Sequence, residues 1–206
     1  MAEVKKNDVK EIRIPSAEKY KMIHPERGMT IDKARSIIDR LFEKPEQYYN
    51  PTENRIKFAS HSDGTWSGEI GNSRLYPNKR ETKEDLEKYD QSFIEYKDGN
   101  PDFSRVSEAT VIIEDMTSYR PSNFKQADIK CSEQWNKIER EGRTDWTPRD
   151  VKQWRQDNKY SWHERIDRKT MDLVPRAIHD ECKHFGGCSE CKQYEKENGI
   201  GGNFDE

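Results

Sequence analysis

The chain has 206 residues, of which 31% are hydrophobic and 37% charged, and its formal net charge is −3. This length allows one domain with appendages, and the low hydrophobic fraction limits its core to a modest size. The 10% of aromatic residues argues against a wholly disordered chain, and the acidic balance argues against a strongly basic nucleic-acid-binding protein.

The first residues, 1–28, show no sustained apolar period, which predicts a flexible leader or linker. A helix is predicted from Thr30, a suitable N-cap residue, to a point before Pro45. Residues 1–10 are charged without an apolar segment, so they are not a signal peptide. No apolar run approaches the roughly 20 residues that span a bilayer, and we therefore expect no membrane insertion.

The middle of the chain predicts short strands followed by two helices. We expect strands at Arg55–Ser60, Ser92–Tyr96 and Ala109–Asp115, with a turn at Asp98-Gly-Asn-Pro. The intervening segment Trp66–Pro77 predicts an ordered loop. A helix should run from Ser122 to about Arg140, and Thr147-Pro-Arg-Asp is typical of a second helix start, for a helix that fades near Asn158.

The C-terminal third predicts a ββα module at 160–187. It comprises a strand at 160–164, a turn through 167–169, a strand at 170–174 and a helix from Pro175 to about His184, stopped by Gly186-Gly187. The fold class is therefore α+β, with this module packed on an upstream α+β framework. The predicted domain covers 29–192, and the Gly-rich, acidic residues 193–206 predict a frayed tail.

Three of the five histidines, His163, His179 and His184, fall within 22 positions on this module. Phosphodiester hydrolysis needs a base for water, a cation that bears charge on phosphate, and neutral imidazoles that hold the cation. The three histidines are the predicted ligands of one divalent cation. His163 and the adjacent Glu164 are the predicted catalytic pair.

The spacing of the helical histidines is a difficulty for this prediction. Residues five apart on an ideal helix point about 140° away from each other. His179 and His184 can therefore share a cation only if His184 lies at an irregular helix end. Asp180 and His184, at positions i and i+4, are the alternative pair on a regular helix.

Basic residues surround the module. Residues 143–192 contain 11 Lys or Arg against 9 Asp or Glu, a local net charge of +2. Such side chains are natural contacts for phosphate oxygens. The predicted contacts are Arg165, Arg168, Lys169 and Arg176.

Three of the four cysteines, Cys182, Cys188 and Cys191, are also clustered here. Thiolates with this spacing could close a tetrahedral Zn²⁺ site with His184, or with Cys131 as the fourth ligand. That structural zinc would make the chain a non-catalytic zinc-binding interaction module, or would brace a catalytic one. Unliganded thiols are the other interpretation.

The motifs together resemble those of a known group. Trp-His-Glu, Asp167, Thr-Met-x-Leu-Val-Pro, Ile-His and His-x-Gly-Gly are similar to the signature of toxin nucleases of the HNH (His-Me finger) superfamily. They most resemble the colicin-like DNase group, often marked by a Trp-His-His triplet. This match covers about 28 residues. Gly-Glu-Ile-Gly-Asn-Ser-Arg, Asn-Pro-Asp-Phe-Ser and Arg-Pro-Ser-Asn-Phe would extend it over most of 55–190.

The resemblance implies a bacterial toxin, an endonuclease with one Mg²⁺, Mn²⁺, Ni²⁺ or Zn²⁺ ion. It would cut DNA in the cytoplasm of a target cell, after export by a route without a signal peptide in this chain. It also implies a cognate immunity protein. The sequence does not separate a DNase from an RNase or tRNase, because that choice depends on groove fit and 2′-OH contacts.

The resemblance also implies residue roles. In the usual His-His pair the first histidine binds metal and the second activates water. In this chain the pair is His163-Glu164. Either His163 is a ligand and Glu164 the base, or His163 is the base and His179, His184 and a further group hold the cation. Glu69 and Arg74 would lie near the site, orienting a catalytic group or touching phosphate.

Overall fold

The structure is a computed structural model that describes residues 48–199. All described residues belong to one compact unit. The predicted leader at 1–28, the helix predicted from Thr30 and the last residues of the predicted tail, 200–206, lie outside the described residues.

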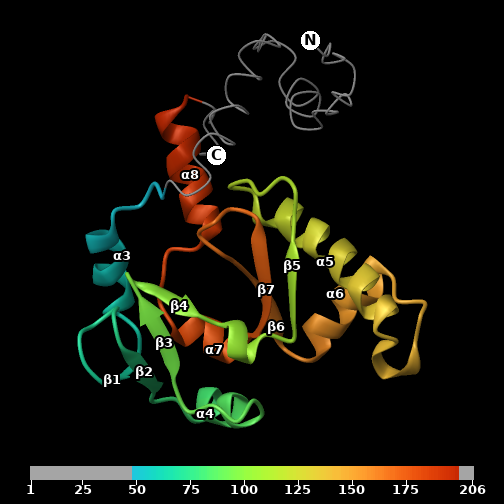
Figure 1. Ribbon diagram of the computed structural model, residues 1–206, viewed down its shortest axis with the longest axis horizontal. Coiled ribbons are helices and arrows are strands. Elements are labelled where there is room, and N and C mark those ends of the chain that lie inside the picture. Colours follow the sequence, from blue (N-terminus) through green and yellow to red (C-terminus); the bar gives the residue numbers. More distant parts are fainter. Residues whose placement is uncertain (1–47, 200–206) are drawn as a thin grey trace, which may run out of the picture. The chain divides into compact units, whose positions relative to one another are not determined.

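The described residues form an α+β fold, as predicted (Figure 1). The helices are α3 (Thr52–Ala59), α4 (Arg80–Glu87), α5 (Arg120–Lys137), α6 (Pro148–Asp157), α7 (Arg176–Glu181) and α8 (Gly187–Glu197). The strands are β1 (Gly64–Trp66), β2 (Arg74–Pro77), β3 (Ile94–Lys97), β4 (Asn100–Asp102), β5 (Ala109–Ile112), β6 (Tyr160–Glu164) and β7 (Thr170–Pro175). Short 3-10 turns occur at Ser104–Val106 and Arg140–Gly142.

The strands of residues 48–199 make two antiparallel sheets. One is 4-stranded with the order β1-β2-β3-β4, and the other is 3-stranded with the order β5-β7-β6. The predicted turn at Asp98 joins β3 to β4, where Lys97 pairs with Asn100. Asp98 and Gly99 have φ values of 52° and 77°, which explains why this turn needs Gly.

Strand β7 lies between two hydrophobic clusters, and all six of its residues are buried. Met171 and Leu173 pack in the cluster that also holds Trp135 and Trp162. Val174 packs in the other, with residues of β2, β3, α4 and α7. Because β6 pairs with β7 along its whole length, the predicted strand 160–164 is held on this central scaffold.

Helices α5 and α6 agree with their predicted positions within a few residues, and Thr147 and Asp150 make the capping box of α6. A buried polar network ties both helices to β6. The carboxylate of Asp128 accepts hydrogen bonds from Arg155 Nε at 2.9 Å and from Trp162 Nε1 at 2.8 Å. The tryptophan before His163 thus anchors β6 through both apolar packing and a hydrogen bond.

The strand predicted at Arg55–Ser60 is wrong, because this segment forms most of helix α3. Polar and apolar residues alternate here, which is typical of a strand. The buried residues are instead Arg55 and Ala59, at helical spacing. Arg55 lies 3.9 Å from the buried carboxylate of Glu190, so contacts distant in sequence decide the helix.

The prediction of a loop at Trp66–Pro77 is also wrong. Trp66 ends β1 and pairs with Leu75 in β2, so only the middle of the segment is irregular. The two strands are only 3 and 4 residues long, and a mainly polar segment rich in Gly and Ser separates them. Such strands carry too few side chains to show an alternating pattern.

The ββα module has both predicted strands, but its helix is shorter than predicted. Pro175 is the N-cap residue, and α7 ends at Glu181 rather than near His184. Gly186 then precedes a further helix, α8, which runs through residues 193–197 of the predicted frayed tail. Contacts from elsewhere hold α8, since Tyr194 packs edge-on against Tyr49 with ring centroids 5.1 Å apart.

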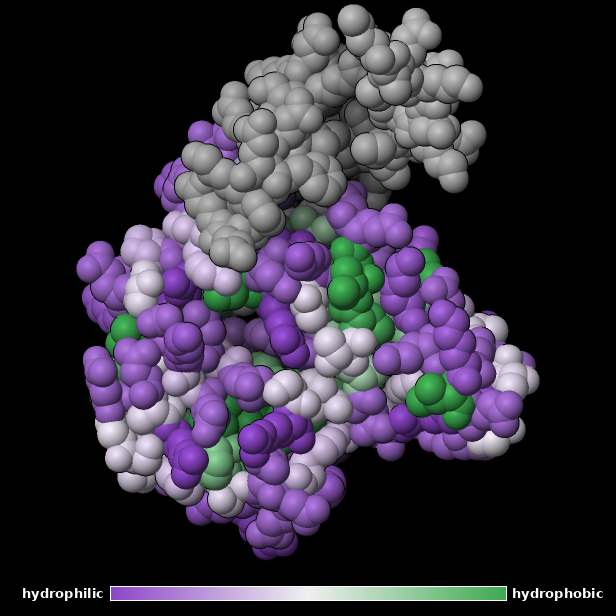
Figure 2. Space-filling view, viewed as in Figure 1, coloured by the Kyte–Doolittle hydropathy of each residue, from purple (hydrophilic) through white to green (hydrophobic). Residues whose placement is uncertain are grey.

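The molecular face in Figure 2 is mainly hydrophilic, with separate hydrophobic groups, as the composition leads one to expect. Within residues 48–199, no helix has both the length and the apolar character that crossing a membrane requires.

Candidate functional site

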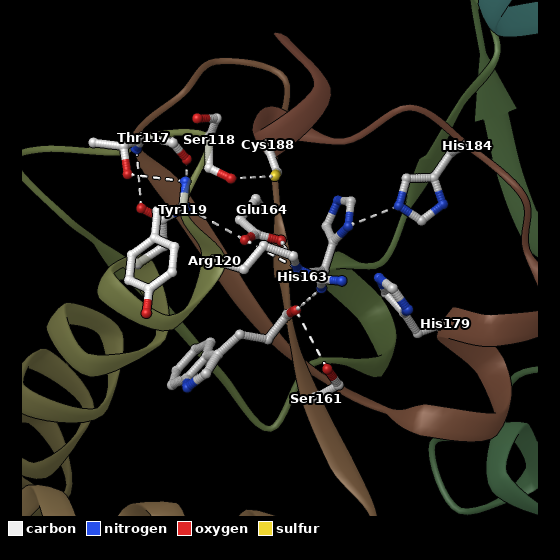
Figure 3. Close-up of polar contacts among 12 residues, drawn as sticks. Thr117, Ser118, Tyr119, Arg120, Ser161, His163, Glu164, His179, His184 and Cys188 are labelled. Carbon is white, nitrogen blue, oxygen red and sulfur yellow. Dashed lines mark hydrogen bonds and ion pairs between the residues drawn. The ribbon is translucent and has the colours of Figure 1, made fainter. Parts of the chain in front are cut away.

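The three histidines of the module converge (Figure 3). His163 comes from β6, His179 from α7 and His184 from the segment after α7. One ring nitrogen of each lies within 4.8 Å of the others, and no further group of this kind occurs among residues 48–199. The predicted metal ligands are therefore brought together.

The early end of α7 removes the difficulty of their spacing. Because the helix stops at Glu181 and Cys182 is extended, His184 turns back toward His179 instead of pointing away. His184 Nδ1 lies 2.6 Å from the carbonyl oxygen of Cys182. A carbonyl only accepts hydrogen bonds, so Nδ1 carries the proton and the Nε2 lone pair faces the other histidines. Asp180 is not part of the group.

Two glycines allow this close approach. A Cβ atom on Gly186 would lie 2.7 Å from the carbonyl oxygen of Glu164, and one on Gly187 would lie 2.3 Å from that of Arg165. Both distances are shorter than real Cβ contacts. The Gly-Gly pair therefore lets the segment that carries His184 cross the end of β6.

Phe103 forms an apolar wall beside the histidines. It is 1% exposed, and its ring centroid lies 4.9 Å from that of His163 and 5.6 Å from that of His184. Sequence reasoning gave this residue no role, although it belongs to the quoted Asn-Pro-Asp-Phe-Ser motif. Its neighbours in the sequence do not indicate that it faces residues 60 or more positions away.

The surroundings favour the neutral form of two of these imidazoles, those of His163 and His184. Burial, reinforced by His184 and His179, holds the pKa of His163 well below its ordinary value. Burial and then His179 lower the pKa of His184 to about 3. Neutral imidazoles are the form that binds metal, so the donor set fits a divalent cation.

The side chain of Glu164 points to the other side of β6. It is 4% exposed and its carboxylate lies 3.3 Å from Arg120 Nε and 3.4 Å from Asn123 Nδ2. Figure 3 shows it turned toward Arg120, away from His179 and His184. Neighbouring strand residues project to opposite faces, so the adjacent His163 and Glu164 serve different surroundings.

A cleft of about 710 Å³ opens beside the histidines. His163, Arg165, His184 and Phe185 line one part of it. The hairpin of β3 and β4 and residues of α3 line the rest. A substrate in this cleft would therefore meet residues from three separate parts of the chain.

Residues 93–186 match the family described as the DNase/tRNase domain of colicin-like bacteriocin. The match confirms the resemblance for this part of the chain, which is similar to a colicin-like nuclease toxin domain. The match includes Phe103, the whole pair His163-Glu164 and both other histidines. Helix α3, the hairpin of β1 and β2, and helix α8 lie outside it. No curated protein matches the chain.

Within the nuclease domain, the predicted phosphate contacts differ in their surroundings. Arg165 lines the cleft but makes a bidentate ion pair with the buried Asp172, at 2.6 and 2.8 Å. Sequence reasoning missed Asp172, since a carboxylate within an apolar strand gives no sign of its partner. Arg176 is exposed at the start of α7 and does not line the cleft.

Upstream of the nuclease match, Glu69 and Arg74 are both exposed and do not line the cleft. Arg74 Nε lies 3.3 Å from Glu95, and its guanidinium carbon lies 4.4 Å from the ring centroid of Phe93. Glu95 does line the cleft. Arg74 therefore contacts a residue that lines the cleft but does not line the cleft itself.

The cysteines predicted as zinc ligands are not brought to one point. Cys188 donates to the carbonyl of Ser118 at 3.2 Å, and Cys191 to that of Met116 at 3.3 Å. Cys182 is buried in the cluster around α7, where burial raises the pKa of its thiol to about 12. Cys131 lies in the other cluster. Among residues 48–199, His184 groups with histidines and not with thiols.

Proposed function

We propose that this chain is a metal-dependent endonuclease that hydrolyses phosphodiester bonds. The observation that carries the proposal is the three-histidine group on a ββα module, with ring nitrogens within 4.8 Å of one another. The nuclease family over residues 93–186 supports the reaction class. Metal dependence is inferred from the converging imidazole nitrogens.

His163, His179 and His184 would hold one divalent cation. Three imidazole nitrogens suit Zn²⁺ or Ni²⁺ better than Mn²⁺ or Mg²⁺, which prefer oxygen ligands. Such a cation, when bound, stabilises negative charge on the phosphate and on the leaving 3′-oxygen. His184 is held for this role by its hydrogen bond to Cys182, which fixes the tautomer that leaves Nε2 available.

Glu164 is the proposed general base on the resemblance alone, because its carboxylate lies on the other side of β6, beside Arg120, and does not line the cleft. As the base it would have to take a proton from the water that attacks phosphorus while the bond from phosphorus to the 3′-oxygen breaks. The alternative is His163 as the base, with His179, His184 and a further group as ligands. It places the base beside the other histidines, since His163 Nδ1 lies 3.0 Å from His184 Nε2.

Arg165 is the proposed phosphate contact with most support, since it lines the cleft beside His163. Arg176 would contact phosphate further along the substrate. Glu69 and Arg74 remain proposed substrate contacts on the resemblance alone. The thiol arrangement gives a structural zinc site at Cys182, Cys188 and Cys191 no support.

The family includes both DNases and tRNases, so the nucleic acid is a proposal as well. We retain DNA as the first candidate, with RNA or tRNA as the alternative. As a bacterial toxin, the protein would act in the cytoplasm of a target cell after export. A cognate immunity protein would neutralise it in the producing cell.

The test is cleavage of plasmid DNA and, in parallel, total RNA by the purified protein. Reactions contain Mg²⁺, Mn²⁺, Ni²⁺ or Zn²⁺, or EDTA. His163→Ala should abolish cleavage, whereas His61→Ala, which removes an exposed histidine outside the group, should not. Full activity in EDTA, or in His163→Ala, would overturn the proposal.

A further inference from the structure

Two phenylalanines are stacked beside the histidine group. The rings of Phe58 in α3 and Phe185 have centroids 4.6 Å apart and an interplanar angle of 1°. Both side chains are partly exposed, and neither belongs to the two hydrophobic clusters of the core. Packing of the core therefore does not explain this pair.

Phe185 also borders the cleft. It follows His184 directly, and both residues line the cleft together with Tyr48, which is 45% exposed. One face of Phe185 lies against Phe58. An aromatic ring that is covered on one face and borders a cleft is the arrangement on which unpaired nucleobases stack.

The charged residues that line the cleft do not favour binding through phosphate contacts alone. Its charged lining residues are three basic and three acidic: Arg55, Lys97, Arg165, Glu95, Asp98 and Asp102. Arg55 and Arg165 already face the carboxylates of Glu190 and Asp172. Neutralisation of phosphates, which contributes to the binding of duplex and single strand alike, is therefore limited in this cleft, and contacts with bases must supply more of the affinity.

We infer that Phe185, supported by Phe58, is a stacking platform for an unpaired nucleobase of the substrate. The substrate class is therefore single-stranded or looped nucleic acid rather than regular duplex. This inference rests on the proposed nuclease function and deepens it. Bases within a duplex are already stacked on both faces, so only an unpaired or extruded base can lie on Phe185.

Binding without metal tests the platform separately from catalysis. Fluorescence anisotropy in EDTA would compare one oligonucleotide sequence as a single strand, as a hairpin loop and as a duplex, in DNA and in RNA. The single strand and loop should bind more tightly than the duplex. Phe185→Ala should weaken single-strand binding roughly tenfold, and Phe185→Trp should retain it. Tyr76→Ala removes an exposed aromatic outside the cleft and should change nothing.

Phe185→Leu completes the series, because it keeps apolar contact with Phe58 but cannot stack on a base. It should bind as weakly as Phe185→Ala while its thermal unfolding matches that of the wild type. Equal binding of duplex and single strand, or wild-type binding by Phe185→Leu, would overturn the inference.

Cleavage of the same oligonucleotides separates the two proposals. With a suitable cation, the wild type should cut the single strand or loop preferentially, and Phe185→Ala should raise KM more than it lowers kcat. Selective binding without any metal-dependent cleavage would retain the platform and refute the nuclease. Metal-dependent cleavage of duplex and single strand at equal rates would retain the nuclease and refute the platform. Preference between the DNA and RNA forms identifies the natural substrate.

Discussion

Nε2 of His184 lies 3.0 Å from Nδ1 of His163, although the two residues are 21 positions apart in the chain. Their meeting depends on two features, the early end of α7 and the glycines that let the next segment cross β6.

Removing His184 should cost metal affinity. His184→Ala deletes one of three imidazole ligands, and we expect Zn²⁺ or Ni²⁺ affinity to fall by more than about a hundredfold, since even outer partners of ligands cost 10- to 100-fold. Isothermal titration calorimetry measures the change, and His61→Ala is the matched control. Unchanged affinity in His184→Ala would remove this residue from the metal site.

The metal-free protein should lose stability in mild acid. Burial and then His179 lower the pKa of His184 from 6.5 to about 3. Between these values the unfolded chain binds a proton here and the folded chain does not, so the free energy of unfolding falls as pH drops below 6.5. Within this range, each drop of one pH unit lowers the free energy of unfolding by about 1 kcal/mol. Above pH 6.5 the contribution of His184 no longer changes with pH.

Urea unfolding of EDTA-treated protein at about pH 7.5 and pH 5.5 measures this loss. The wild type should lose about 1 kcal/mol more than His184→Gln, which cannot take up the proton. Equal losses in the two proteins would contradict the assignment to His184.

Glu164→Gln should separate catalysis from packing. The amide keeps the size of the carboxylate but cannot accept a proton, so kcat should fall by about 10²- to 10⁴-fold. Thermal unfolding and metal affinity should change little by comparison. Glu164→Gln with wild-type turnover would leave Glu164 a structural partner of Arg120 and transfer the base role to another group.

Gly187→Ala should disturb the start of α8. Its Cβ would lie 2.3 Å from the carbonyl oxygen of Arg165 and 2.5 Å from Met116 Sδ. We expect a loss of about 1 to 3 kcal/mol in the free energy of unfolding, with weaker metal binding. Gly68→Ala, whose Cβ would make an ordinary 3.4 Å contact, is the control. Similar unfolding curves for both variants would refute the close approach.

Asp128→Ala should destabilise the fold strongly. It would leave the buried guanidinium of Arg155 and the indole N–H of Trp162 without their shared acceptor. Loss of one partner of a buried ion pair costs about 3 to 5 kcal/mol. Chemical unfolding checks this value against Asp145→Ala, at a surface pair where Asp145 is 77% exposed. A small change would mean that water replaces the carboxylate.

Local patterns in the sequence predicted much of the module. The strand at 160–164, its partner from Thr170, and the capping box at Thr147 all follow from residues near one another in the chain. The identities of the three histidines and their family resemblance followed in the same way. These features could be predicted because hydrophobic period, turn residues and cap residues act over a few positions.

Longer contacts decided the rest. Glu190 holds Arg55 and thereby favours a helix where alternation indicated a strand, and Tyr49 and Tyr194 support a helix in the predicted tail. Contacts between distant parts of the chain also place Phe103, Asp172 and the stacked pair of Phe58 and Phe185 beside the site.

By itself, the sequence determined which chemical groups this protein has available. These are histidines whose imidazoles can be neutral, a carboxylate beside one of them, and a strand-strand-helix segment that carries them. Only the tertiary structure decided that the three imidazoles meet and that Glu164 turns away toward Arg120. The physical reason is that ligand geometry and burial depend on where a helix ends and what packs against it, and those are set by residues far apart in the chain.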